Sequence, residues 1–71
     1  MTLRATFTLN GDEIIRLYAI TNGESELVAK IRGKVSKILH TMTAPWEWYI
    51  AIETPTNISS LWVHEIQREG R

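Results

Sequence analysis

The residues best suited to chemistry are sparse in this chain, which has two histidines, no cysteine and only scattered carboxylates. Nucleophilic catalysis needs a base held beside a serine, cysteine or threonine. His40 falls where a histidine can complement the dipole of a predicted helix. His64 precedes Glu65, and neighbouring residues of a strand point to opposite faces, so these two do not form a local pair. We therefore expect no catalytic residues and no enzymatic activity.

The sequence also lacks the residue pattern of a metal or cofactor site. A metal ion is usually held by three or four converging ligands, whereas the two histidines stand far apart in the sequence. The four glycines are isolated, so no glycine-rich loop can cradle a phosphate. The sequence predicts no metal site, no cofactor and no small-molecule substrate.

Length and charge limit the remaining possibilities. A chain of 71 residues is predicted to form a single domain over residues 1–71. Eight basic and eight acidic residues give zero formal net charge, which lacks the basic excess of a dedicated nucleic-acid binder and eases association with another protein. No apolar run approaches the ~20 residues that span a bilayer, and the start at Met1 lacks the form of a secretory signal. A cytoplasmic location without a membrane partner is expected.

The first third of the chain is predicted to be a β-hairpin. Residues 3–9 alternate between apolar and polar side chains, which is typical of a strand. Asn10-Gly11 suits a two-residue hairpin turn, so a second strand should follow. Residues 12–21 are rich in β-branched and aromatic side chains, which favours that strand. A helix over 12–21, closed by Gly23, is the alternative.

Residues 24–42 are predicted to form an amphipathic helix. Their apolar side chains recur at intervals of one, three and four, which places them in one stripe. Ser25 can cap the start of the helix, and the residue before Pro45 avoids the helical region. An alternative keeps the segment in the sheet, as two strands joined by a turn at Arg32-Gly33. The stripe consists of Leu27, Val28, Ile31, Val35, Ile38, Leu39 and Met42.

Two more strands are predicted at 46–53 and 60–66, which gives an α+β fold class. The expected architecture is a small β-β-α-β-β domain, with an antiparallel sheet and one helix packed on one face. If 12–21 is helical, the order becomes β-α-α-β-β. The predicted core consists of Phe7, Leu17, Leu27, Ile31, Val35, Ile38, Trp48 and Ile50.

The sheet face that the helix leaves uncovered is the first candidate binding surface. Aromatic and arginine side chains are enriched at protein interfaces. The predicted function is therefore a small non-enzymatic binding or regulatory module that acts through a protein–protein interface, with a second copy of the chain as the simplest partner. By analogy with small proteins of phages and mobile elements, it would be an inhibitor or accessory protein. The residues assigned to this surface are Arg4, Arg16, Tyr18, Tyr49, Trp62 and His64.

Nucleic-acid binding is the alternative function. Lys30, Lys34 and Lys37 stand at i, i+4 and i+7, hence on one face of the predicted helix, and Arg32 lies between them in sequence. A basic helix can contact phosphates. The same residues would form the solvated polar face that any such helix needs, so their pattern fits both a phosphate-binding face and an ordinary solvent-exposed face.

A second route to nucleic acid follows if 12–21 is helical. The order of strand, helix, glycine turn and a second helix opening at Ser25-Glu26-Leu27 then resembles the ribbon-helix-helix repressors. The resemblance covers about residues 3–42. It implies a dimer in which the strand pairs with its copy and its outward side chains read the major groove. Those side chains would be Arg4, Thr6 and Thr8.

Overall fold

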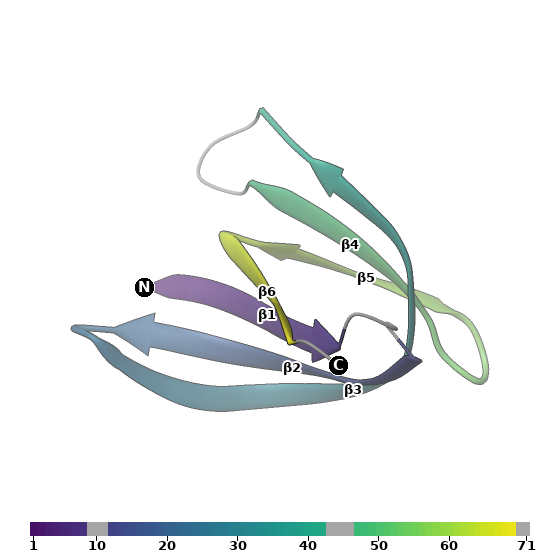
Figure 1. Ribbon diagram of the computed structural model, residues 1–71, viewed down its shortest axis with the longest axis horizontal. Coiled ribbons are helices and arrows are strands. Elements are labelled where there is room, and N and C mark those ends of the chain that lie inside the picture. Colours follow the sequence, from purple (N-terminus) through teal and green to yellow (C-terminus); the bar gives the residue numbers. More distant parts are fainter. Residues whose placement is uncertain (9–11, 43–46, 70–71) are drawn as a thin grey trace.

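The protein is an all-β structure built from one curled sheet. The computed structural model describes residues 1–8, 12–42 and 47–69, and Figure 1 shows their arrangement. Within these ranges there is no helix, so none is long and apolar enough to cross a membrane. The strands are β1 (Thr2–Thr8), β2 (Asp12–Thr21), β3 (Glu24–His40), β4 (Trp48–Glu53), β5 (Ile58–Val63) and β6 (Glu65–Glu69).

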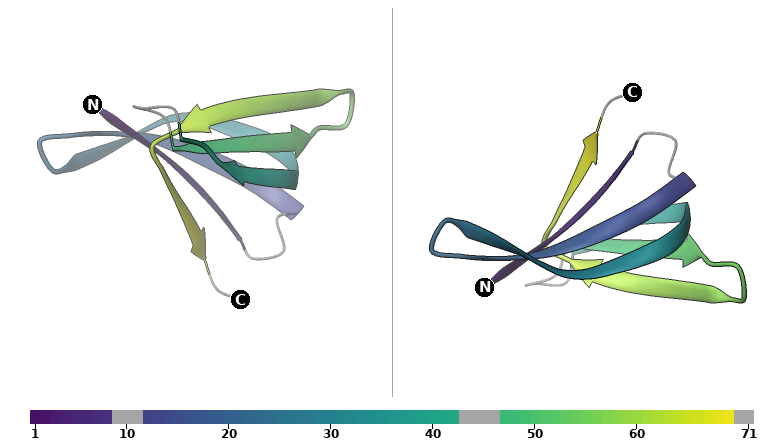
Figure 2. Two further views of the ribbon diagram at one scale, coloured as in Figure 1. Left: turned by 90° about the horizontal axis from the view of Figure 1, so that it is seen from above. Right: turned by 90° about the horizontal axis from the view of Figure 1, so that it is seen from below.

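The strands form one six-stranded sheet in the order β5-β4-β3-β2-β1-β6. Each neighbouring pair is antiparallel except β1 and β6, which run parallel. The sheet curls into half of a barrel, and the hairpin of β4 and β5 folds back over β1 and β2 (Figures 1 and 2). The two edge strands, β5 and β6, are consecutive in the chain and are separated only by His64.

The long strand β3 produces the curl. It has 17 residues and pairs with β2 from Glu24 to Lys34 and with β4 from Lys34 to His40. Beside this transfer point Gly33 packs directly against β4. A Cβ atom at Gly33 would lie 2.6 Å from the carbonyl oxygen of Glu53 and 2.7 Å from Cγ2 of Ile52. Only glycine lets the two strands approach this closely.

The predicted helix at 24–42 is therefore wrong, and so are the α+β class and the β-β-α-β-β order. An interval of four residues fits one face of a helix, but it is also an even number, so Ile31 and Val35 share a face of a strand as well. The alternative turn at Arg32-Gly33 is wrong too, because β3 continues through it without a break.

Two β-bulges explain why the apolar residues of β3 do not simply alternate. The first bulge lies in β3 opposite Leu17 and Tyr18 of β2, where the register of the β2–β3 pair shifts. The second lies between Val35 and Lys37, where the register of the β3–β4 pair shifts. Each bulge adds one residue to β3 and moves the following side chains to the other face. At the second bulge the extra residue is Ser36, whose hydroxyl donates a hydrogen bond of 3.3 Å to the carbonyl oxygen of Ala51.

The strand predicted at 12–21 is confirmed as β2. It joins β3 through Asn22 and Gly23, whose φ angles of 53° and 83° are both positive, as a two-residue hairpin turn of this type requires. The alternative β-α-α-β-β order is therefore wrong, and the resemblance to ribbon-helix-helix repressors does not hold. The predicted turn at Asn10-Gly11 lies outside the described residues.

The core fills the concave side of the curled sheet. Phe7 and Ile50 are buried, as predicted, whereas Leu27 is 42% exposed and was wrongly assigned to the core. The other predicted core residues are partly buried and pack against the centre: Leu17, Ile31, Val35, Ile38 and Trp48. The fully enclosed cluster consists of Ala5, Phe7, Ile15, Ile50, Ile52 and Val63.

Candidate anion-binding surface

The convex side of β2 and β3 gathers basic side chains. In β3, Lys30, Arg32 and Lys34 alternate with core-facing residues and so share the outer face. Arg16 of β2 stands directly opposite Lys30, and directly opposed residues share a face. We refer to Arg16, Lys30, Arg32 and Lys34 as the basic face. The zero net charge of the chain therefore conceals an uneven distribution of charge.

Acidic residues compensate the basic face at one end only: Lys34 stands opposite Asp12 of β2 and Glu53 of β4, whereas in the described strands no acidic residue is directly opposite the other three cations. Opposed like charges on neighbouring strands are destabilising, and Arg16 and Lys30 form such a pair. In the part of the chain whose side chains are described, one ion pair occurs, between Nε of Arg4 and Oε1 of Glu65 at 3.3 Å. This ion pair lies on β1 and β6. Among the residues whose side chains are described, none of the basic face takes part in an ion pair.

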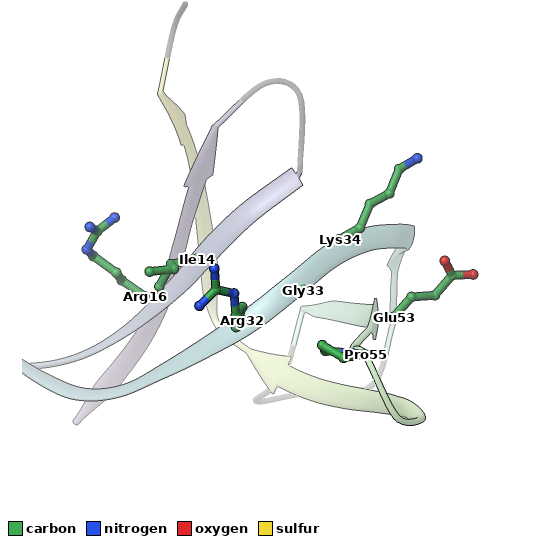
Figure 3. A pocket seen from close by; sticks show the side chains of 7 residues that line it. All are labelled: Ile14, Arg16, Arg32, Gly33, Lys34, Glu53 and Pro55. Carbon is green, nitrogen blue, oxygen red and sulfur yellow. The ribbon is translucent and has the colours of Figure 1, made fainter.

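A hollow of about 580 Å³ lies on this surface, next to the close approach of β3 and β4 (Figure 3). Gly33 contributes to the lining between Arg32 and Lys34, although its own missing side chain would point toward the core. Glu53 and Pro55 form the wall on the β4 side, so the lining holds three cations and one carboxylate. The hollow is lined by Ile14, Arg16, Arg32, Gly33, Lys34, Glu53 and Pro55.

The strand residues proposed for the nucleic-acid alternative are less accessible. Arg4 and Thr6 lie on the outer face of β1, opposite Tyr18 and Arg16, but Thr6 is only 4% exposed. The hydroxyl oxygen of Thr8 is buried and has no hydrogen-bond partner among the described residues. Thr6 is therefore not available for contact with a ligand.

The aromatic surface predicted from sequence is divided into two separate groups. Tyr18 stands opposite Arg4 on β1 and Leu27 on β3. Tyr49 contacts Trp62 on the neighbouring strand, with ring centroids 4.9 Å apart and a tilt of 60°. Both groups lie on the convex side, but Leu27 and Leu39, which stands opposite Tyr49, are twelve positions apart, toward opposite ends of β3.

Lys37 lies beyond the second bulge of β3, where it stands opposite Ala51 of β4. It belongs to the same convex side but is separated from Lys34 by the register shift. The basic side chains proposed from sequence are therefore brought together in part: Lys30, Arg32 and Lys34 are neighbours, Arg16 joins them from β2, and Lys37 stands apart.

His64 closes the curled sheet instead of joining a binding surface. Its Nδ1 accepts a hydrogen bond of 3.0 Å from the backbone N–H of Leu3, and its own backbone N–H donates to the Leu3 carbonyl oxygen at 3.0 Å. These bonds hold the junction of β5 and β6 against the start of β1.

Replacing His64 by alanine should leave the partly buried N–H of Leu3 without this acceptor. We expect the free energy of unfolding to fall by about 1–2 kcal/mol in urea titrations. His64→Asn should recover most of the loss, because an asparagine side chain also offers an acceptor near this position. Equal losses in both variants would contradict the role assigned to Nδ1.

The second histidine packs against an aromatic ring. The ring centroids of His40 and Trp48 lie 4.7 Å apart at the end of the β3–β4 ladder. Among the described residues no group of three or more histidines, aspartates and glutamates is placed to hold a metal ion.

Sequence reasoning missed several residues that line the hollow. Ile14 and Glu53 carried no motif, and Gly33 was considered only as part of the alternative turn at Arg32-Gly33. Comparisons with protein-family models, curated proteins and solved structures find no match to this chain.

Proposed function

We propose that the protein is a non-enzymatic module that binds single-stranded nucleic acid through the basic face. Arg16, Lys30, Arg32 and Lys34 would contact successive phosphates along the convex side of β2 and β3. A cytoplasmic location is part of this proposal. The proteins of the nucleic-acid-binding class obtain much of their affinity from such phosphate contacts, which release counterions.

The observation that carries the proposal is the placement of Arg16 directly opposite Lys30. This pair costs stability in the free protein, and the neighbouring Arg32 adds to the repulsion because it points to the same side. The charge of Lys34 is offset by the acidic residues that stand opposite it on β2 and β4. A polyanion bound across the two strands would remove that cost. The arrangement therefore favours a ligand with regularly repeated negative charges.

Tyr18 supports a single-stranded ligand in particular. It lies on the same face as Arg16, two residues further along β2, and is half-buried. An aromatic ring beside a basic track allows one base to stack while the phosphates follow the cations, and such stacking contributes about 1–3 kcal/mol per base.

Salt-dependent binding tests the proposal. Affinity for a fluorescent single-stranded oligonucleotide should fall with salt, with a log–log slope of about −3 if all four cations contact phosphates. The quadruple variant Arg16→Gln/Lys30→Gln/Arg32→Gln/Lys34→Gln should flatten this slope. Binding that is weak at all salt concentrations, or unchanged in the quadruple variant, would overturn the proposal.

Matched single substitutions control for net charge. Arg32→Gln and Arg68→Gln each remove one positive charge, but Arg68 stands opposite Phe7 and therefore faces the concave side. Only Arg32→Gln should reduce the slope, by about 0.7. Likewise Tyr18→Ala should weaken binding at high salt, whereas Tyr49→Ala should not. Equal effects within either pair would show that the ligand does not use the basic face.

A further inference from the structure

The two edges of the sheet differ sharply in charge. The β6 edge has the sequence Glu-Ile-Gln-Arg-Glu, whereas the β5 edge, Ile-Ser-Ser-Leu-Trp-Val, has no charged residue and no proline. Exposed edge strands usually carry charges, prolines or bulges that prevent pairing with another chain. The β4–β5 ladder, moreover, runs without a register shift from Glu53 to Trp48. The β5 edge therefore lacks the usual protection.

Self-pairing is compatible with β5 and unfavourable for β6. If β6 paired with its own copy in antiparallel fashion about Gln67, Glu65 would stand opposite the partner's Glu69 twice. Like charges placed directly opposite are destabilising. An antiparallel pair of β5 strands encounters no such repulsion, and the zero net charge of the whole chain adds none.

The side chains of β5 also complement their own copy. Ile58, Ser60 and Trp62 alternate onto the convex face, and Ile58 and Trp62 are 69% and 47% exposed. In an antiparallel pair centred on Ser60, each Ile58 would stand opposite the partner's Trp62. A pair of an aromatic and a β-branched side chain is a favourable cross-strand combination. The two-fold symmetry of the dimer would form this pair of Ile58 and Trp62 twice, once on each side of the axis.

The start of β5 is already fixed in its conformation. In the turn between β4 and β5, the backbone N–H of Thr54 donates to the carbonyl oxygen of Asn57 at 2.8 Å. The Thr54 hydroxyl donates to the same carbonyl oxygen at 2.9 Å and accepts from the Asn57 N–H at 3.1 Å. A rigid edge loses less conformational entropy when it binds.

We propose that β5 is a dimerisation edge, at which two copies of the chain pair antiparallel about Ser60 and join their sheets into one. Trp62, which contacts Tyr49 within its own chain, would then extend its apolar contact to the partner's Ile58. This inference does not depend on nucleic-acid binding, because the basic face lies on β2 and β3. Isologous pairing of this kind gives a closed dimer.

Cross-linking tests the pairing and its register. The chain has no cysteine, so Ser60→Cys introduces a single thiol at the proposed two-fold axis. Opposed residues of an antiparallel pair have Cα atoms about 4.5–5.5 Å apart, which suits a disulfide. Mild oxidation of the purified protein should link Ser60→Cys into dimers much faster than Ser25→Cys, whose thiol would sit on the exposed part of β3. Equal rates would overturn the proposal.

Sedimentation of the unmodified chain provides the second test. A dimer of the 8.2 kDa chain should form with rising concentration and in the absence of nucleic acid. Ser60→Lys places two ammonium groups together at the axis and should raise the dissociation constant by about tenfold or more, while Ser25→Lys should leave it unchanged. A chain that stays monomeric at the highest concentration reached, or a dimer insensitive to Ser60→Lys, would overturn the proposal.

Discussion

Gly33→Ala is expected to remove most of the protein's stability at 25 °C. The added methyl group would lie 2.6 Å from the carbonyl oxygen of Glu53, which belongs to a paired strand and cannot move without disturbing the β3–β4 ladder. Its second contact, at 2.7 Å, is Cγ2 of Ile52, a fully buried core side chain. Overpacking of this kind costs about 3 kcal/mol, close to the whole stability, roughly 3–5 kcal/mol, of a domain this small.

Gly23→Ala is the matched control for this prediction. Gly23 has a φ of 83° but no atom within 4 Å of an added Cβ. Its replacement should therefore cost only the backbone strain, about 1–2 kcal/mol. Both variants would be compared by urea unfolding, followed through the circular dichroism of the sheet. If Gly33→Ala were the more stable of the two, the close approach of β3 and β4 would be refuted.

Ile50→Ala is the second substitution with a large expected effect. Ile50 is completely buried between Ile38 of β3 and Leu61 of β5, so truncation removes apolar contacts and leaves a cavity. Such changes cost about 2–5 kcal/mol, and the variant should melt far below the unmodified protein or fail to show a cooperative transition.

Met42→Ala removes a side chain of comparable size from the surface, where Met42 is 92% exposed. The change in the free energy of unfolding should stay within about 0.5 kcal/mol. Melting followed by circular dichroism at low protein concentration keeps any self-association out of the comparison. Similar melting temperatures for Ile50→Ala and Met42→Ala would show that the concave side of the sheet is not the core.

Three of the strands could be predicted from sequence. Residues 3–9 correspond to β1, and 12–21 and 46–53 to β2 and β4, although the predictions at Leu9 and Trp46 lie outside the described residues. In residues 3–9 one face is apolar and the other polar, so the period of two is visible, whereas residues 12–21 were predicted from their β-branched and aromatic content. The strand predicted at 60–66 exists but is broken at His64 into β5 and β6.

β3 could not be predicted because two bulges hide its period. Its core-facing residues change from odd to even numbers across Ser36, so the complete set fits a helical stripe better than a regular strand. A contrary signal was nevertheless present. Asn22-Gly23 is the same dipeptide as Asn10-Gly11, and interpreting both pairs as hairpin turns would have placed β3 directly beside β2.

The basic residues were recognised, but for the wrong geometric reason. Lys30 and Lys34 share a face at an interval of four in a helix and also in a strand. Arg32 joins them only in a strand, where it lies midway between the two on the same face. Arg16 comes beside Lys30 through the β2–β3 register, and a register between strands cannot be read from either strand alone.

The parallel pairing of β1 with β6 governs the order in which the fold can be completed. Leu3 and His64, whose mutual hydrogen bonds begin this pairing, are 61 residues apart in the chain. The hairpins β2–β3, β3–β4 and β4–β5 are local and can form early, whereas β1 keeps an unsatisfied edge until β6 arrives. Such distant pairings slow folding. During synthesis, an early and partly folded chain would therefore present the outer edge of β1 to its neighbours, and this step would control the yield of native protein.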